Sequence, residues 1–297
     1  MNSENHRWLV AVSVMFGTFM VVLDTTVVNV SLPHVAGNLN ASVEESTWAL
    51  TSYLAANAII LPITGWLSTL IGRRRLLILS VASFTAASFL CGLAMSLPML
   101  IVCRIAQGAT GGVMQPLSQA VMLEAFPPKE RGKAMALFSI GIVVAPILGP
   151  VLGGWLTDTY SWRWVFFINV PVGVLAIFML RAFVHDPAYL KRGFKRIDYF
   201  GISLLTIGIG ALQIGLDKGQ EEDWFESHFI TALIVTAAIA LGVFVLHELL
   251  VRDPVVQLRA FRERSFAAGT LLVTLMSVGL FGSLVMLPVL LQTLMGY

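Results

Sequence analysis

The sequence predicts an all-α protein that crosses a membrane many times. Only 12% of its 297 residues are charged, 57% are hydrophobic, and the mean hydropathy is +0.83. A soluble domain carries about 25% charged residues, so this chain has too little polar surface to cover a soluble globule of its size. The apolar residues also form long continuous runs without period-two alternation, which favours membrane-spanning helices over a β-barrel.

Nine apolar runs are long enough to cross the hydrocarbon core of a bilayer, which takes about 20 helical residues. In chain order they are Trp8–Leu32, Thr47–Ile71, Leu76–Leu97, Met99–Phe126, Ala134–Leu156, Trp164–Phe183, Tyr199–Leu216, Phe229–Val251 and Phe266–Leu291. The first run follows Arg7 as a signal peptide would follow its basic residues. It is too long for a signal peptide, contains Asp24 and lacks a small-residue cleavage pattern, so we count it as the first span.

The positions of Lys and Arg predict the orientation of these spans. With the N-terminus in the cytoplasm, sixteen of the nineteen basic residues fall in cytoplasmic segments. Arg163 and Lys218 fall outside, and Arg104 lies within a span. Because one wrong early span would destroy this asymmetry, we predict a cytoplasmic N-terminus.

Loop length and charge divide the chain into three predicted parts. Residues 1–183 hold six spans with short connections and form an N-terminal bundle. Residues 184–251 hold the basic stretch His185–Arg196 and an inserted pair of spans joined by the acidic loop Asp217–Ser227. Residues 252–297 hold the basic segment Arg252–Arg264 and the ninth span, as the cytoplasmic linker and the start of a C-terminal bundle.

Two charged residues lie well inside predicted spans, Asp24 in the first and Arg104 in the fourth. Charges within a bilayer are costly and therefore mark functional sites. The two depths are similar, which allows an ion pair or a shared polar cavity. Burial disfavours the ionised form of a carboxyl group and a nearby cation favours it, so a movement of Arg104 relative to Asp24 would load or release a proton. A purely structural pair is the alternative.

The fifth span is rich in residues that bend a helix or let another helix come close. Prolines remove helical hydrogen bonds, and glycines let two backbones approach. Such a face suits a gate that seals tightly, and an ordinary kinked packing helix is the alternative. The residues concerned are Gly141, Ala145, Pro146, Gly149, Pro150, Gly153 and Gly154.

The fourth span carries a stripe of polar and small residues on one helical face. The stripe predicts either a cavity lining or a tight helix interface, and Gln107 lies beside it. Glu124, near the cytoplasmic end, is either functional or simply solvated. Cys91 and Cys103 lie in apolar runs and are predicted to be small hydrophobic residues, so no metal site is expected. The stripe consists of Arg104, Gly108, Gly111, Gln115 and Gln119.

Five segments together resemble the drug:proton antiporters of the major facilitator superfamily, in the fourteen-span group typified by EmrB and QacA. They lie in this order on the expected helices, and the inserted pair of spans also agrees with a fourteen-span layout. The resemblance implies the major facilitator fold. The segments are Leu23–Pro33, Gly65–Ser68 with Gly72–Arg75, Arg104–Gly108, Ala145–Gly154 and Trp162–Pro171.

The resemblance also implies roles for individual residues. Asp24 would take part in proton coupling, Arg104 in proton transfer, and the glycines and prolines of the fifth span in gating. Thr69 stands where the superfamily loop has an aspartate, so the acidic latch residue is missing. The expected substrate cavity comprises Asn29, Gln107, Gln115 and Gln119, and the expected cytoplasmic latch comprises Gly65, Gly72, Arg73 and Arg74.

We therefore expect a secondary transporter of the bacterial inner membrane that exports small apolar or amphipathic drug-like compounds as protons enter. No phosphate-binding loop and no His-Glu-x-x-His pattern is present in the sequence, so we expect no ATP drive, no cofactor, no metal and no enzyme activity. A proton-coupled importer and a non-transporting fragment are the alternatives.

The expected partners are the substrate and the bilayer, without nucleic acid. An EmrB-like protein would also work with a periplasmic adaptor of the EmrA type and an outer-membrane channel, whereas a QacA-like one would work alone. Alternating access in this fold needs two bundles, so we expect the chain to be part of a longer transporter; a half-size protein that dimerises is the alternative.

Overall fold

The computed structural model describes residues 3–186, 198–251 and 254–293. Over these residues the regular elements are α-helices and two short 3₁₀ helices, which confirms the all-α prediction. The α-helices are α1 (Ser3–Asn38), α2 (Val43–Ser46), α3 (Trp48–Ile71), α4 (Arg73–Gly92), α5 (Leu97–Ala125), α6 (Arg131–Thr159), α7 (Trp164–Phe167), α8 (Asn169–Phe183), α9 (Tyr199–Lys218), α10 (His228–Leu250) and α11 (Arg264–Thr293). The 3₁₀ helices are η1 (Trp224–Glu226) and η2 (Leu258–Arg262).

Eight helical stretches in the described chain are long and apolar enough to cross a membrane, and they correspond to predicted spans one to eight. The predicted ninth span, Phe266–Leu291, lies within α11. The stretch Arg264–Gly279 of that helix is apolar. Beyond it, most side chains of α11 lie outside the described residues. The three-part division of the chain stays a prediction, because residues 187–197 and 252–253 at its two boundaries lie outside the described residues.

Several predicted span boundaries differ from the helix ends. The first helix continues to Asn38, beyond Leu32, because Pro33 removes one backbone donor without stopping the helix. The third span begins at Arg73 and ends at Gly92, several residues before the predicted Leu97. The chain can start α4 directly after α3 because Gly72 adopts φ = 91°, a conformation that glycine reaches without steric cost.

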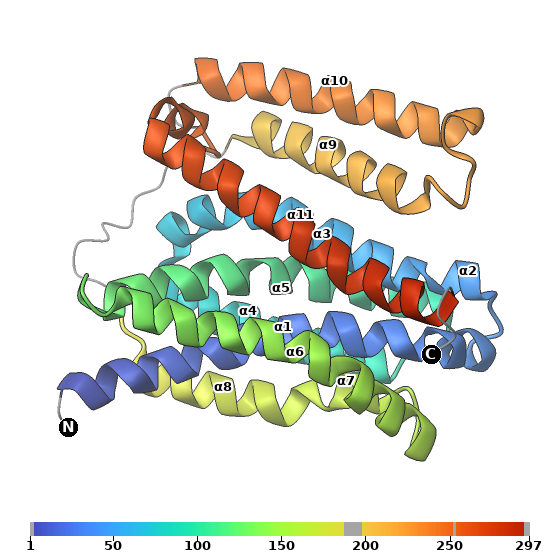
Figure 1. Cartoon of the computed structure of the whole chain (residues 1–297), viewed down its shortest axis with the longest axis horizontal. Coiled ribbons are helices and arrows are strands. Elements are labelled where there is room, and N and C mark those ends of the chain that lie inside the picture. The colour runs from blue at the N-terminus through green and yellow to red at the C-terminus, as the bar shows by residue number, and fades with distance from the viewer. Residues whose placement is uncertain (1–2, 187–197, 252–253, 294–297) are drawn as a thin grey trace.

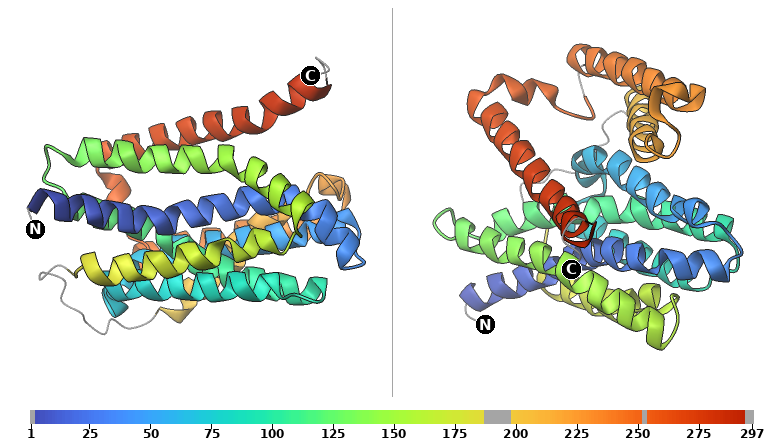
Figure 2. Two further views of the ribbon diagram at one scale, coloured as in Figure 1. Left: turned by 90° about the horizontal axis from the view of Figure 1, so that it is seen from below. Right: turned by 45° about the vertical axis from the view of Figure 1, so that its right-hand side comes forward.

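The first eight helices pack side by side as a bundle, with α1 and α5 in contact with most of the others (Figures 1 and 2). α3 packs along α5, α6 along α1, and α4 lies against both α5 and α8. Large apolar side chains fill the space between these helices. The core includes Met20, Tyr53, Phe84, Met114 and Phe138, all at most 1% exposed.

The helices α9 and α10 form a pair that packs on the outside of this bundle through the contact of α9 with α3 (Figure 1). Ile63, Leu205, Phe244 and Val255 form a small apolar cluster at that contact. The last helix, α11, packs chiefly against η2. Its side chains are more than half exposed at Leu271, Leu272, Val273, Leu275 and Met276, as expected of a helix that faces lipid or a further helix.

Candidate functional site

Asp24 and Arg104 meet inside the bundle, where α1 crosses α5. Arg104 Nη1 lies 2.5 Å from Asp24 Oδ2, and both side chains are 0% exposed. Of the two arrangements that the sequence allowed, the structure therefore has the ion pair. A buried charge pair is stable only when further hydrogen bonds compensate the loss of water, so the surroundings of the pair decide its behaviour.

Arg104 has further contacts besides Asp24. Its Nε donates to the carbonyl oxygen of Ala49 at 3.0 Å, and its Nη1 donates to Gln107 Oε1 at 2.7 Å. The guanidinium carbon lies 4.0 Å above the ring of Tyr53, within the range of a cation–π contact. Among the described residues its Nη2 atom has no hydrogen-bond partner, which leaves one buried donor free beside the pair.

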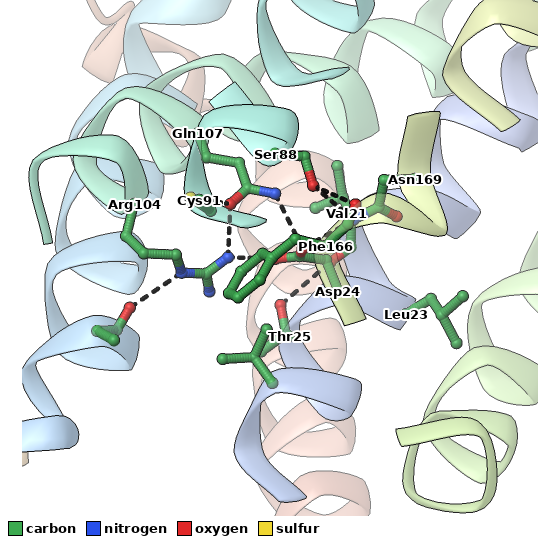
Figure 3. A network of polar contacts seen from close by, with 12 residues as sticks. Val21, Leu23, Asp24, Thr25, Ser88, Cys91, Arg104, Gln107, Phe166 and Asn169 are labelled. Carbon is green, nitrogen blue, oxygen red and sulfur yellow. Dashed lines mark hydrogen bonds and ion pairs between the residues drawn. The ribbon is translucent and has the colours of Figure 1, made fainter. Parts of the chain in front are cut away.

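Asp24 accepts two further hydrogen bonds on its other oxygen (Figure 3). Gln107 Nε2 and Asn169 Nδ2 donate to Asp24 Oδ1, at 2.9 and 3.0 Å. Asn169 Nδ2 also donates to Ser88 Oγ at 3.0 Å, and Ser88 donates in turn to the carbonyl oxygen of Phe166 at 2.9 Å. Four helices, α1, α4, α5 and α8, thus contribute polar side chains to one closed cluster.

Sequence reasoning missed Asn169 and Ser88 as site residues. The sequence did offer a signal for Asn169, because it is an amide near the start of the predicted sixth span and lies within the segment Trp162–Pro171 that resembles the antiporters. Ser88 gave no signal, because a single serine in an apolar helix usually bonds to its own backbone. Only the packing of α4 against α8 turns its hydroxyl toward Asn169.

The small residues of α5 form a tight helix interface rather than a cavity. A Cβ atom on Gly108 would collide with the backbone carbonyl group of Tyr53, and one on Gly112 would lie 2.6 Å from the carbonyl oxygen of Asn57. Both obstacles are backbone atoms of α3, which cannot move aside as a side chain can. The contact of α5 with α3 brings Ala49 and Tyr53 to Arg104.

The predicted gating glycines of α6 pack against α1, close to Asp24. A Cβ on Gly149 would collide with the side chain of Thr26, and one on Gly153 would lie 2.9 Å from the carbonyl oxygen of Val27. Pro146 lies one turn before Gly149 inside α6, Pro150 lies between the two glycines, and the helix bends in its second half (Figure 2). Gly154 has open space around it.

Three of the predicted cavity residues lie outside the Asp24 cluster. Asn29 is exposed on α1, whereas Gln115 and Gln119 are half-buried on α5. Only Gln107 of the four belongs to the network around the ion pair.

The predicted latch residues join helices of this bundle to one another. Arg73 forms an ion pair with Glu124 of α5. The backbone N–H of Arg74 donates to Asp186 Oδ1 at 2.7 Å, and its side chain donates to the carbonyl oxygen of Arg181 at 2.7 Å. Gly65 is exposed and has open space around it. Arg73 and Arg74 thus have carboxylate partners in Glu124 and Asp186, whereas Thr69 bonds to the carbonyl oxygen of Trp66.

An apolar groove of about 350 Å³ lies between α1 and α6. Gly141 belongs to its lining, and the side chain of Met15 lies 3.2 Å from the place where a Cβ on that glycine would stand. Thr18 is the sole polar residue among the lining residues. The other lining residues are Val12, Phe16, Phe19, Leu137, Phe138 and Ile142.

Two further buried charges lie at the ends of the inserted helix pair, where the sequence gave no reason to expect burial. Lys218 is 4% exposed and donates to Thr47 Oγ1 at 2.5 Å and to Glu221 at 2.7 Å. At the other end, Glu248 is 1% exposed and accepts from the backbone N–H of Val256 at 3.0 Å. Lys218 thus attaches the helix pair α9–α10 to Thr47 before α3, and Glu248 attaches it to the segment that follows α10.

Comparison with known proteins gives consistent matches. A family model described as "Major Facilitator Superfamily" matches residues 14–297. The multidrug export protein EmrB of Escherichia coli K12 is 44% identical over 97% of this chain and 56% of its own length. The fatty acid resistance protein FarB of Neisseria gonorrhoeae is 42% identical over 97% of this chain and 57% of its own length. The chain thus spans little more than half the length of these relatives.

Solved structures with the same helix arrangement include two transporters. A proton:xylose symporter, XylE, aligns with a TM-score of 0.57 at 19% identity, over 74% of this chain and 55% of its own. A peptide transporter, POT, aligns with a TM-score of 0.60 at 14% identity, over 82% of this chain and 52% of its own. At such low identity the likeness concerns the fold alone.

Proposed function

This chain belongs to the major facilitator superfamily, and from that premise we propose that it serves in proton-coupled export of small, largely apolar compounds. The chain is a multi-pass membrane protein with the fold of transporters. Export as the direction of transport is supported by the relatives that are named for multidrug export. The fold alone would not decide it, since a proton symporter shares that fold.

The observation that carries the proposal is the buried pair of Asp24 and Arg104. An arginine stays protonated in proteins, so Asp24 is the member of the pair that can take up and release a proton. In the closed cluster the carboxylate is ionised and compensated. When the helices move so that the contact of Arg104 with Asp24 weakens while water stays excluded, protonation becomes favourable; entry of water or a restored contact favours release. Alternating access would expose Asp24 first to one side of the membrane and then to the other.

The apolar groove between α1 and α6 supports a substrate of apolar character. Its lining consists of aliphatic and aromatic side chains, with Thr18 as the single hydroxyl-bearing residue. A cavity of that kind binds by excluding water and discriminates weakly among apolar groups, which fits a transporter of several compounds. Gly141 lies in the same groove, so a substrate there would contact the helix to which we assign the gate.

The proposed gate is the contact of α6 with α1. Gly149 and Gly153 let α6 approach Thr26 and Val27 within one helical turn of Asp24. Movement at Pro146 and Pro150 would open or close this seam beside the proton site. A substrate in the groove and a proton on Asp24 would thus act on the same pair of helices.

We place the protein in a bacterial inner membrane with its N-terminus in the cytoplasm, as the distribution of basic residues predicts. In one form of the proposal the protein works with a periplasmic adaptor and an outer-membrane channel. In the other form it works alone. Arg73 and Arg74, which tie α4 to α5 and α8, would stiffen the cytoplasmic end of the bundle during the movement.

The proposal is tested with the full-length protein in proteoliposomes that contain a fluorescent apolar dye and carry an imposed pH gradient. The wild type should move the dye against its concentration gradient, and the direction of that movement separates an exporter from an importer. Asp24→Asn should abolish uphill movement because the site can no longer ionise. Ser80→Ala, a change of a buried residue elsewhere on α4, serves as a control. Uphill transport by folded Asp24→Asn at the wild-type rate would disprove the role of Asp24.

A further inference from the structure

The hydrogen bonds around Asp24 fix which end of each neighbouring amide faces the carboxylate. Gln107 Oε1 lies 2.7 Å from Arg104 Nη1 and 3.5 Å from Cys91 Sγ, and both of these groups are donors. A carbonyl oxygen must therefore occupy that position, which directs the Gln107 NH₂ group to Asp24. Ser88 donates to the carbonyl oxygen of Phe166, so its own oxygen accepts from Asn169 Nδ2.

All the neighbours of the carboxylate are thus donors. Asp24 Oδ2 faces Arg104, and Asp24 Oδ1 faces the NH₂ groups of Gln107 and Asn169. This arrangement matches the ionised form, which only accepts. A protonated carboxyl group has an O–H that needs an acceptor, and a buried O–H that faces only donors is strongly unfavourable.

The proton has one oxygen available to it. Arg104 cannot give up its own proton and continues to donate to Oδ2, so the new O–H bond forms at Oδ1. One of the two amides must then present its carbonyl oxygen. Gln107 cannot, because its rotation would place an NH₂ group against the guanidinium group of Arg104, at the position where Oε1 now lies 2.7 Å away.

Asn169 can make this change. Rotation of its amide by half a turn puts Oδ1 where Nδ2 now lies, within reach of both Asp24 Oδ1 and Ser88 Oγ. A carbonyl oxygen accepts two hydrogen bonds, one from protonated Asp24 and one from Ser88 after its hydroxyl has turned away from Phe166.

We propose that Asn169, together with the rotating hydroxyl group of Ser88, is the positioning unit that senses the protonation state of Asp24. The inference rests on the proposed role of Asp24 as proton carrier. With Asp24 ionised, the Asn169 amide donates to it; with Asp24 protonated, the amide turns and accepts from it. Asn169 is the first residue of α8, and Ser88 lies in α4. The protonation state of Asp24 in α1 is thereby transmitted to two other helices.

The other titratable groups near Asp24 do not replace this unit. α3 brings Tyr53, which lies under Arg104, and α4 brings Cys91, which bonds to Gln107. The charged residues of α6 and α8 in the described chain lie toward the ends of those helices, away from the cluster. Asn169 is thus the neighbour that can both donate to and accept from Asp24 without displacing Arg104.

The direct test is pH-difference infrared spectroscopy of the full-length protein in liposomes. A carboxyl band that is missing in Asp24→Asn should appear on acidification. The amide carbonyl band that is missing in Asn169→Leu should shift with the same pH midpoint. If the Asp24 band titrates while the Asn169 band stays fixed, the inference is wrong and the proposed function stands. If no Asp24 band appears while the protein transports, the proposed function fails as well.

A functional measurement separates this role from a merely structural one. Asn169→Leu removes a donor from the ionised form, so the pH midpoint of dye transport should rise by about one unit. Asn169→Asp has the same shape and should raise it further, because two carboxyl groups then share one site. Ser80→Ala, a change of a buried hydroxyl on the same helix as Ser88, should leave the midpoint unchanged. Unchanged midpoints in both folded Asn169 variants would overturn the inference.

Discussion

At the scale of single residues, the central feature is a carboxylate whose neighbours are all donors. Arg104 satisfies one oxygen of Asp24, and two amides satisfy the other. The buried charge of each partner is tolerable only because the other is present. The same dependence lets a small displacement change the protonation state of the site, and it predicts how the site fails when one member is removed.

Arg104→Ala should lower the free energy of unfolding by about 3–5 kcal/mol, because it leaves the Asp24 carboxylate buried without its partner. Arg104→Lys should lose less, since it keeps the charge but not the bonds to Ala49 and Gln107. Thermal unfolding of the detergent-solubilised protein measures both. The double variant Asp24→Asn with Arg104→Gln should regain much of the loss. If Arg104→Ala unfolded at the wild-type temperature, the pair would be excluded as a stabilising contact.

At the scale of helices, glycine determines which pairs come close. Gly108 and Gly112 bring α5 onto the backbone of α3, and Gly149 and Gly153 bring α6 onto α1. The first contact brings Ala49 and Tyr53 to Arg104, and the second forms the seam that we assign to the gate. The helix-bending prolines of α6 lie along the chain next to these glycines, Pro146 one turn before Gly149 and Pro150 directly after it.

Two neighbouring glycines of α6 test this packing. Gly153→Ala should destabilise the protein by about 1–3 kcal/mol, because the added methyl group meets the backbone of Val27. Gly154→Ala, which has open space, should be neutral or should stabilise the helix by up to about 1 kcal/mol. Parallel thermal unfolding of the two variants measures the difference. Equal melting temperatures would show that α6 and α1 are not in close contact there.

At the scale of the whole molecule, the bundle and the inserted pair are joined by both apolar and polar contacts. α9 packs on α3 through the cluster around Ile63 and Leu205. Near the other end of α9, Lys218 binds Thr47, and Asp217 accepts a hydrogen bond from Thr51. In the predicted orientation, this polar attachment lies on the side opposite to Arg73 and Glu124.

The orientation gives a whole-molecule prediction. A cysteine in place of exposed Gln220 should react with a membrane-impermeant maleimide in intact cells, whereas one in place of exposed Lys129 should react only after the membrane is opened. Both variants carry Cys91→Ala and Cys103→Ala, and the parent without an added cysteine is the control. The reverse labelling pattern would place the N-terminus outside.

The sequence by itself determined the fold class, the helices and the identity of the charged pair. Long apolar runs leave no alternative to spanning helices, and a charge that is expensive in lipid stands out in any single run. Pattern also located the close-packing faces of α5 and α6, since a stripe of glycines appears in the sequence itself. It could not say whether the stripe on α5 lined a cavity, because that depends on which helix lies opposite.

Only the tertiary structure decided which partners surround Asp24. Ser88, Gln107 and Asn169 come from three different helices, and no periodicity within one helix relates them. Hydrogen bonds are short and directional, so small differences in how α4, α5 and α8 pack determine whether these side chains meet. The sequence determined where the charges lie along the chain; the packing of the helices determined which groups stabilise them.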